Sequence, residues 1–169
     1  MATKKLKILF RTYGGKVKNK QTGLGHIFRC INLSYYLKQS ADIHFLVEDY
    51  GGVKQIINDY GFKTFSSLKK NISLDADLKK TIQYIDKNAI DVLIIDKHKT
   101  EIKYLKELKK IVKTVIITDL ENVNLPVDIL VNGYIGLKNQ KYKNKHNSLC
   151  LVGPSYQILN QKFSKKSKS

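Results

Sequence analysis

The chain has 169 residues, of which 42% are apolar, and its 31 Lys and Arg residues against 14 Asp and Glu give a formal net charge of +17. This length and composition support one folded domain with a sizeable core and exclude the low-hydrophobicity class of disordered chains. No apolar run approaches the roughly 18 residues of a membrane-spanning helix, and the N-terminus lacks the apolar segment of a signal peptide. We therefore expect a cytoplasmic protein with no membrane span.

Short continuous apolar runs alternate with amphipathic stretches from the N-terminus onward. Strands buried on both faces of a parallel sheet have such runs. The first half of the pattern predicts a strand at residues 6–11, a polar glycine-rich loop at 12–25, a helix with its apolar residues at 27, 30, 31, 34 and 37, a strand at 43–47, a helix at 53–60 closed by Gly61, and a strand at 62–65.

The second half continues the alternation, with a helix at 74–88, a strand at 91–96, a Lys-rich helix at 101–111, and strands at 112–118 and 127–131. Strands that alternate with helices in this way form a parallel sheet covered on both faces. The predicted fold class is therefore α/β, with a Rossmann-like parallel sheet flanked by helices.

The positive charge suggests nucleic acid as a partner, but the kind of basic residue argues against it. Only Arg11 and Arg29 are arginines, whereas base and phosphate recognition usually depends on the bidentate guanidinium. We interpret the lysines as a solvated basic surface, with a funnel for an anionic ligand as the alternative. Cys30 and Cys150 lie far apart in sequence without metal-type spacing, so we expect neither a disulfide nor a metal site.

Open α/β sheets bind ligands at the carboxyl ends of their strands, which places residues 11–26, 48–52, 96–98 and 119–122 there. Gly23-Leu24-Gly25-His26 joins the first loop to the first helix, and its two glycines allow the backbone to turn tightly and approach a ligand. Phe28 stands where a dinucleotide fingerprint has its third glycine, and no Gly-Lys-Ser/Thr follows. A tight turn with a locally packed histidine remains the alternative.

The string Gly-x-Gly-His-x-x-Arg-Cys at residues 23–30 resembles the opening of the nucleotide-sugar hydrolases of pseudaminic-acid biosynthesis. These hydrolases act on UDP-2,4-diacetamido-2,4,6-trideoxy-L-altrose and group with spore-coat polysaccharide glycosyltransferase-like proteins. Four further segments follow in the family's order. Residues 94–98 resemble its strand followed by Asp-His-Tyr, 117–120 its Asp-Asp-Leu, 127–132 its strand ending in Asn, and 153–159 its Gly-Pro-x-Tyr-x-x-Leu hinge.

This resemblance implies a GT-B architecture, in which two Rossmann-like domains enclose the sugar and the C-terminal domain holds most of the UDP. Residues 1–152 would be the N-terminal domain, and residues 153–169 the hinge, the start of a C-terminal domain and a basic tail. The C-terminal nucleotide-binding domain is then an expected partner of this chain, in cis or in trans. Four residues depart from the family: Tyr13 stands for its Asp, Lys97 and His98 for its His-Tyr pair, and Asn160 for its hinge Arg. The first loop is also longer, and its additional residues include Lys16, Lys18 and Lys20, which we expect to be exposed.

Hydrolysis at a nucleotide-linked anomeric carbon needs a water molecule, a group that takes its proton, and stabilisation of the leaving diphosphate. Imidazole suits the second task near pH 7. His26 is therefore the predicted catalytic residue, with no metal and no cofactor. The predicted substrate-binding residues are Arg11, Gly23, Gly25, Arg29, Asp96, His98 and Asp119. Each also has a plain structural interpretation, as a tight turn, a surface loop, a helix cap or, for Arg29, a local salt bridge.

The sequence leaves three functions open. The first is a hydrolase that releases UDP from an activated deoxy-diacetamido sugar by C–O cleavage. The second is a GT-B glycosyltransferase of polysaccharide biosynthesis, in which His26 would deprotonate an acceptor hydroxyl. The third is a non-catalytic basic module that binds anions, which would explain the charge but not the Gly-Leu-Gly-His string.

Overall fold

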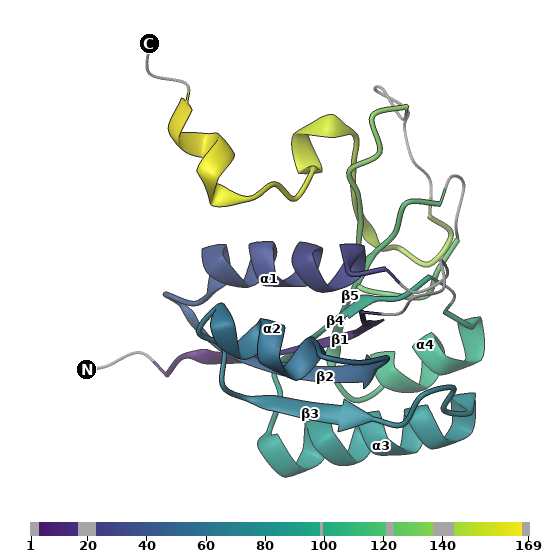
Figure 1. The fold of residues 1–169 in the computed structure, drawn as a ribbon. Helices are drawn as coiled ribbons and strands as arrows, with labels where there is room; N and C mark the ends of the chain where they lie inside the picture. The colour runs from purple at the N-terminus through teal and green to yellow at the C-terminus, as the bar shows by residue number, and fades with distance from the viewer. Residues whose placement is uncertain (1–3, 17–22, 99, 121–123, 137–143, 167–169) are drawn as a thin grey trace.

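Seven strands form one sheet in the computed structural model, which describes residues 4–16, 23–98, 100–120, 124–136 and 144–166 (Figure 1). The strands are β1 (Leu6–Gly14), β2 (Ala41–Asp49), β3 (Phe65–Leu68), β4 (Val92–Asp96), β5 (Lys113–Ile117), β6 (Ile129–Asn132) and β7 (Leu149–Val152). The helices are α1 (Gly25–Leu37), α2 (Val53–Asp59), α3 (Leu74–Asn88) and α4 (Ile102–Lys109), and two 3₁₀ turns follow at Pro154–Tyr156 and Gln161–Lys166.

All neighbouring strands are parallel, and their order across the sheet is β3-β2-β1-β4-β5-β6-β7. The chain therefore builds outward from β1 to one edge and then returns to β4 to build toward the other. This arrangement confirms the predicted α/β, Rossmann-like parallel sheet. The reversal of order between β1 and β4 is the place at which such sheets form a crevice.

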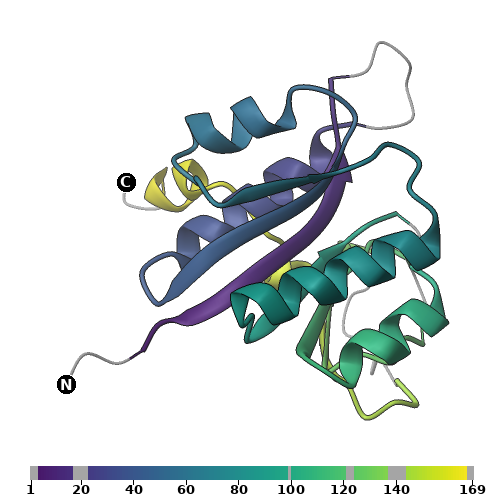
Figure 2. The ribbon, with the colours of Figure 1, turned by 90° about the horizontal axis from the view of Figure 1, so that it is seen from below.

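Two apolar layers cover the sheet, one on each face. α1 and α2 pack on the face that carries Ile8, Phe10 and Ile94, whereas α4, together with Ile85 of α3, packs on the face that carries Leu9 and Ile95. Figures 1 and 2 show these helix pairs on opposite sides of the strands. Because side chains alternate between the faces of a strand, consecutive residues within β1, and within β4, pack in different layers.

The predicted third strand is misplaced by three residues, because the structure has it at Phe65–Leu68. The apolar Phe62 instead completes the end of α2. Gly61 has φ +84°, its N–H donates to the carbonyl of Asn58 at 2.8 Å, and the N–H of Phe62 donates to that of Ile57 at 3.2 Å. This pair of bonds is a Schellman motif, which places an apolar residue directly after the glycine to pack back on the helix.

Most other predicted boundaries differ from the structure by one or two residues, and two differences are larger. β1 continues to Gly14, because Thr12 pairs with Val47 on one side and Asp96 on the other. β7 adds a last strand that pairs with β6. Of the loop lysines, Lys16 is exposed as predicted, and Lys18 and Lys20 lie outside the described residues.

The segment after β7 returns across α1, as the yellow end of the ribbon in Figure 1 shows. Ile158 packs against the α1 side of the core, and Nδ2 of Asn160 donates to Oδ1 of Asn32 at 3.1 Å. Its role as a hinge stays a prediction. Within the described part of the chain, none of the helices has the length and apolar character needed to cross a membrane.

Candidate active site

The candidate site lies at the carboxyl edge of the sheet, between the ends of β1 and β4. α1 begins beside this crevice at Gly25, and His26 is its second residue. Asp96 is the last residue of β4, and its side chain and that of His26 meet there. Residues 70 positions apart in sequence are thus joined at the point where the strand order reverses.

Close packing at this edge requires glycine at two positions that the sequence analysis did not single out. A Cβ on Gly14 would lie 2.8 Å from a side chain of α1, and a Cβ on Gly15 would lie 2.5 Å from the backbone that follows β2. Gly23 and Gly25 are exposed, and among the residues that the structure describes a Cβ there would meet nothing nearer than 4.0 Å. The ligand contact predicted for Gly23 and Gly25 stays a prediction, and the packing itself does not explain them.

His26 pairs with a buried carboxylate. Its Nδ1 lies 2.6 Å from Oδ1 of Asp96, whose side chain is fully buried, while the imidazole is 23% exposed. Two lone pairs cannot face each other at this distance, so Nδ1 carries the hydrogen and donates it to the carboxylate. In the neutral imidazole the remaining lone pair is then on Nε2. A base whose other nitrogen is held by a carboxylate is the arrangement used for proton abstraction.

Arg29 lies one helical turn after His26 and grips the same carboxylate with two bonds. Its Nε donates to Oδ2 of Asp96 at 2.7 Å, and its Nη2 donates to Oδ1 at 2.7 Å. Burial raises the pKa of Asp96, but the bonds from Arg29 and His26 and the Arg29 charge outweigh burial, so the pKa lies below its usual value. Asp96 is therefore ionised near neutral pH and fixes the orientation of both partners.

The third nitrogen of Arg29 extends the cluster to the next strand end. Nη1 donates to Oδ1 of Asp119 at 2.5 Å, and the Asp119 side chain is otherwise largely exposed. Burial alone lowers the pKa of Arg29, yet its bonds and charge pairs with Asp96 and Asp119 raise it overall. The structure thus brings together His26, Arg29, Asp96 and Asp119, four of the predicted site residues, and Arg29 has the salt bridge that its structural interpretation expected.

Tyr13, named in the sequence only as a departure from the family, belongs to this cluster. Its hydroxyl lies 3.2 Å from Nε2 of His26, and the two rings lie 4.8 Å apart between centroids. Burial and the charge of Asp96 raise the pKa of Tyr13, while the backbone N–H of His98 lowers it. His98 lies two residues beyond the end of β4, and its side chain is exposed.

Arg11 lies elsewhere, on the α3 and α4 side of the sheet. Its side chain has no exposed surface, and its Nε and Nη2 donate to the two oxygens of Asp77 at 2.9 and 2.7 Å. Glu48 lies 3.6 Å from Nη2, and Lys97 donates to Asp77 at 2.6 Å. Arg11 therefore serves a buried ion network here and does not join the cluster of His26.

The period of two along a strand could have separated these groups. Thr12 pairs with Asp96 in register, so Arg11 one residue earlier must point to the other face. Nothing in the sequence indicated that Asp77, Lys97 and Glu48 would meet there, because they come from three different elements. Among the residues that the structure describes, no three His, Cys, Asp or Glu side chains are grouped to hold a metal ion.

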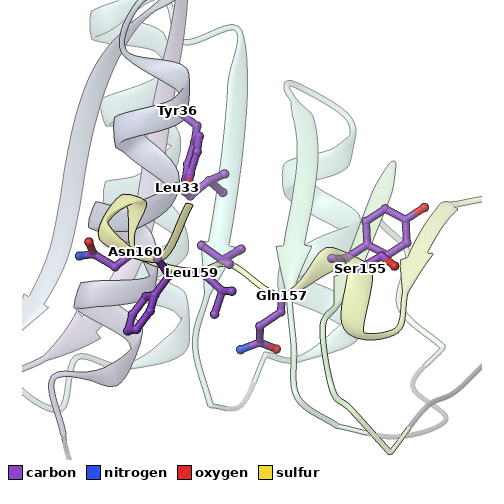
Figure 3. A pocket seen from close by; sticks show the side chains of 9 residues that line it. Leu33, Tyr36, Ser155, Gln157, Leu159 and Asn160 are labelled. Carbon is purple, nitrogen blue, oxygen red and sulfur yellow. The ribbon is translucent and has the colours of Figure 1, made fainter. Parts of the chain in front are cut away.

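A separate hollow of about 350 Å³ lies between α1 and the C-terminal segment (Figure 3). Leu33 and Tyr36 of α1 line one side, and Gln157, Leu159 and Asn160 line the other. No predicted site residue borders this hollow, so it is distinct from the cluster of His26.

Comparison with known proteins leaves the family open. No protein-family model matches the chain. No curated protein matches it either.

Proposed function

We propose that this chain is the catalytic-face domain of a nucleotide-sugar hydrolase, which removes UDP from an activated deoxy-diacetamido sugar by C–O cleavage. The observation that carries the proposal is the His26–Asp96 pair at the strand-order reversal of a Rossmann-like sheet. The resemblance of the strings around residues 23–30, 94–98 and 117–120 to the hydrolase family supplies the substrate class. In the GT-B arrangement that this family implies, a C-terminal domain would hold the UDP.

The chemistry follows from the geometry of the cluster. With Nδ1–H held by Asp96, His26 has its basic nitrogen, Nε2, beside the hydroxyl of Tyr13. A water molecule attacks the anomeric carbon, its proton passes toward His26, and the C–O bond to the diphosphate breaks with its electron pair leaving on UDP. The Asp96 carboxylate stabilises the imidazolium that forms, and Arg29 keeps Asp96 ionised.

The test is release of UDP from a panel of UDP-linked amino sugars in ¹⁸O-labelled water, with the chain combined with its C-terminal domain. C–O cleavage places the label in the sugar and none in the phosphate. His26→Ala should lower turnover by roughly 10²-fold or more, the usual contribution of acid-base catalysis. His146→Ala is the matched control, because this imidazole lies in the loop before β7 and outside the cluster.

Two outcomes would replace this function. UDP release that depends on an added sugar acceptor identifies a glycosyltransferase, in which the same His26 deprotonates the acceptor. Absence of turnover together with strong, salt-dependent retention on DNA identifies a basic binding module. Near-normal turnover by the His26→Ala variant would remove His26 from the mechanism and direct attention to His98.

A further inference from the structure

The hydroxyl of Tyr13 occupies the position at which a reacting oxygen would meet His26. It lies 3.2 Å from Nε2, and the tyrosine ring is tilted against the imidazole with 4.8 Å between centroids. Because Nδ1 carries its hydrogen toward Asp96, Nε2 of the neutral imidazole can only accept. The phenol of Tyr13 must therefore donate to it, and the base is already hydrogen-bonded before any substrate arrives.

We propose that Tyr13, His26 and Asp96 form a proton relay in which Tyr13 is the catalytic residue that contacts the nucleophile, with His26 acting through it. This inference rests on the proposed function for the identity of the reaction. The relay itself does not depend on the reaction, since hydrogen bonds within the protein join Tyr13 to His26 and His26 to Asp96.

The proton balance of the step is complete. The nucleophilic water loses a proton to the phenolic oxygen of Tyr13, and Tyr13 passes its own proton to Nε2 of His26. The water oxygen forms the new bond to the anomeric carbon, and the bond to the diphosphate oxygen breaks with its electron pair. Tyr13 ends neutral, and His26 ends as an imidazolium beside the Asp96 carboxylate.

The surroundings of Tyr13 suit this role on both sides of the proton transfer. Burial and the negative charges of Asp96 and Glu48 keep the resting phenol protonated, so it can donate. The backbone N–H of His98 and the positive charge of Arg29 act in the opposite direction and stabilise negative charge on the phenolic oxygen. A group that is neutral at rest and supported while it transiently loses its proton is matched to a relay.

Tyr13 is also held where it can serve the crevice. It belongs to β1, one residue beyond Thr12, which pairs with Asp96. Tyr13 itself pairs with Glu48 of β2, while the register with β4 ends at Thr12. Tyr13 is therefore a strand residue rather than part of a loop, and its side chain remains partly exposed. Groups built on strands hold a catalytic geometry more accurately than groups on loops.

The first test uses the chain alone and no substrate. Long-range ¹H–¹⁵N NMR of ¹⁵N-histidine-labelled protein near pH 8 distinguishes the two imidazole tautomers. We expect His26 to show a protonated Nδ1 and a hydrogen-bonded, unprotonated Nε2. Tyr13→Phe should shift the Nε2 resonance toward that of an imidazole without this bond, while Tyr36→Phe, an exposed tyrosine on α1, should leave it unchanged. A protonated Nε2 in the wild type would overturn the relay.

The second test measures turnover of a nucleotide sugar by the two-domain protein. Tyr13→Phe should lower kcat by roughly 10²-fold, and the double variant Tyr13→Phe/His26→Ala should be no slower than His26→Ala alone, because groups that act in series are not additive. Normal kcat in Tyr13→Phe would refute the catalytic role. If the NMR result is as expected but no nucleotide sugar is hydrolysed, the proposed function is wrong, whereas the hydrogen bonds that link Tyr13, His26 and Asp96 are confirmed.

Discussion

In the buried network around Arg11, Asp77 has more bonding partners than Arg11 has, so the loss of each residue has a different effect. Asp77 accepts bonds from Arg11, from Lys97 at 2.6 Å, and from the hydroxyls of Thr81 and Tyr104 at 3.1 and 3.3 Å. Arg11 donates to Asp77 and to the carbonyl of Thr12, and its Nη2 lies 3.6 Å from the Glu48 carboxylate. Removing Arg11 leaves a carboxylate with three donors, whereas removing the charge of Asp77 leaves two cations with one more distant carboxylate.

We therefore expect Asp77→Asn to destabilise the fold more than Arg11→Met. Removing one partner of a buried ion pair costs about 3–5 kcal/mol because the other charge stays buried and uncompensated. Arg11→Met keeps much of the side-chain volume and leaves Asp77 paired with Lys97, so about 1–3 kcal/mol is expected from the lost hydrogen bonds. The free energy of unfolding of a domain is about 5–15 kcal/mol, so Asp77→Asn should remove a large part of it.

Urea unfolding followed by circular dichroism measures both free energies. Asp75→Asn is the matched control, because Asp75 lies in the same first turn of α3 but is exposed. It should cost no more than about 1 kcal/mol, the usual strength of a charge at a helix N-terminus. Equal stability of Asp77→Asn and Asp75→Asn would show that the network is dispensable. A larger loss in Arg11→Met than in Asp77→Asn would refute the asymmetry.

Three further predictions concern charge and ligand. Burial raises the pKa of Asp77, but the bonds and charges of Arg11 and Lys97 outweigh burial and lower it to about 2. The ionised carboxylate therefore stabilises the fold by about 2 kcal/mol above pH 4, and this stabilisation is lost as pH falls toward 2. The stability gap between wild type and Asp77→Asn should accordingly narrow when urea unfolding is repeated at pH 3, and a constant gap would contradict the shift. Asp96→Asn should lower nucleotide-sugar turnover by about 10²-fold or more, because its amide N–H₂ can face Nδ1 and favour the wrong tautomer of His26; wild-type kcat would exclude the orienting role. Residues 1–169 alone should bind UDP more weakly than micromolar by calorimetry, because under the GT-B proposal orienting the diphosphate needs both walls of the cleft; micromolar binding would place the nucleotide site within this domain.

The sequence by itself determined the parallel sheet with its flanking helices, whereas the order of the strands came from the structure. Continuous apolar runs mark strands that are buried on both faces. Amphipathic helices between such strands can cover both faces of the sheet when the strands run parallel. α3 has the bounds that were predicted from the sequence. In the structure Ser73 caps it, Asp75 and Asp77 lie in its first turn, and Ala89 ends it in a left-handed conformation. The same rule that places ligands at strand ends also singled out His26, Asp96 and Asp119.

Other features were decided only by the tertiary structure, since they depend on contacts between distant segments. Arg11 and Asp77 lie 66 residues apart in sequence, and nothing local to either one indicates a partner. The predicted start of the third strand was wrong, because Phe62 belongs to the C-terminal cap of α2 rather than to the sheet. Tyr13 looked like a mere replacement in a loop, but β1 extends to Gly14, and the hydroxyl of this strand residue lies beside Nε2 of His26. Local patterns report which side chains need burial, and only packing decides which of them meet.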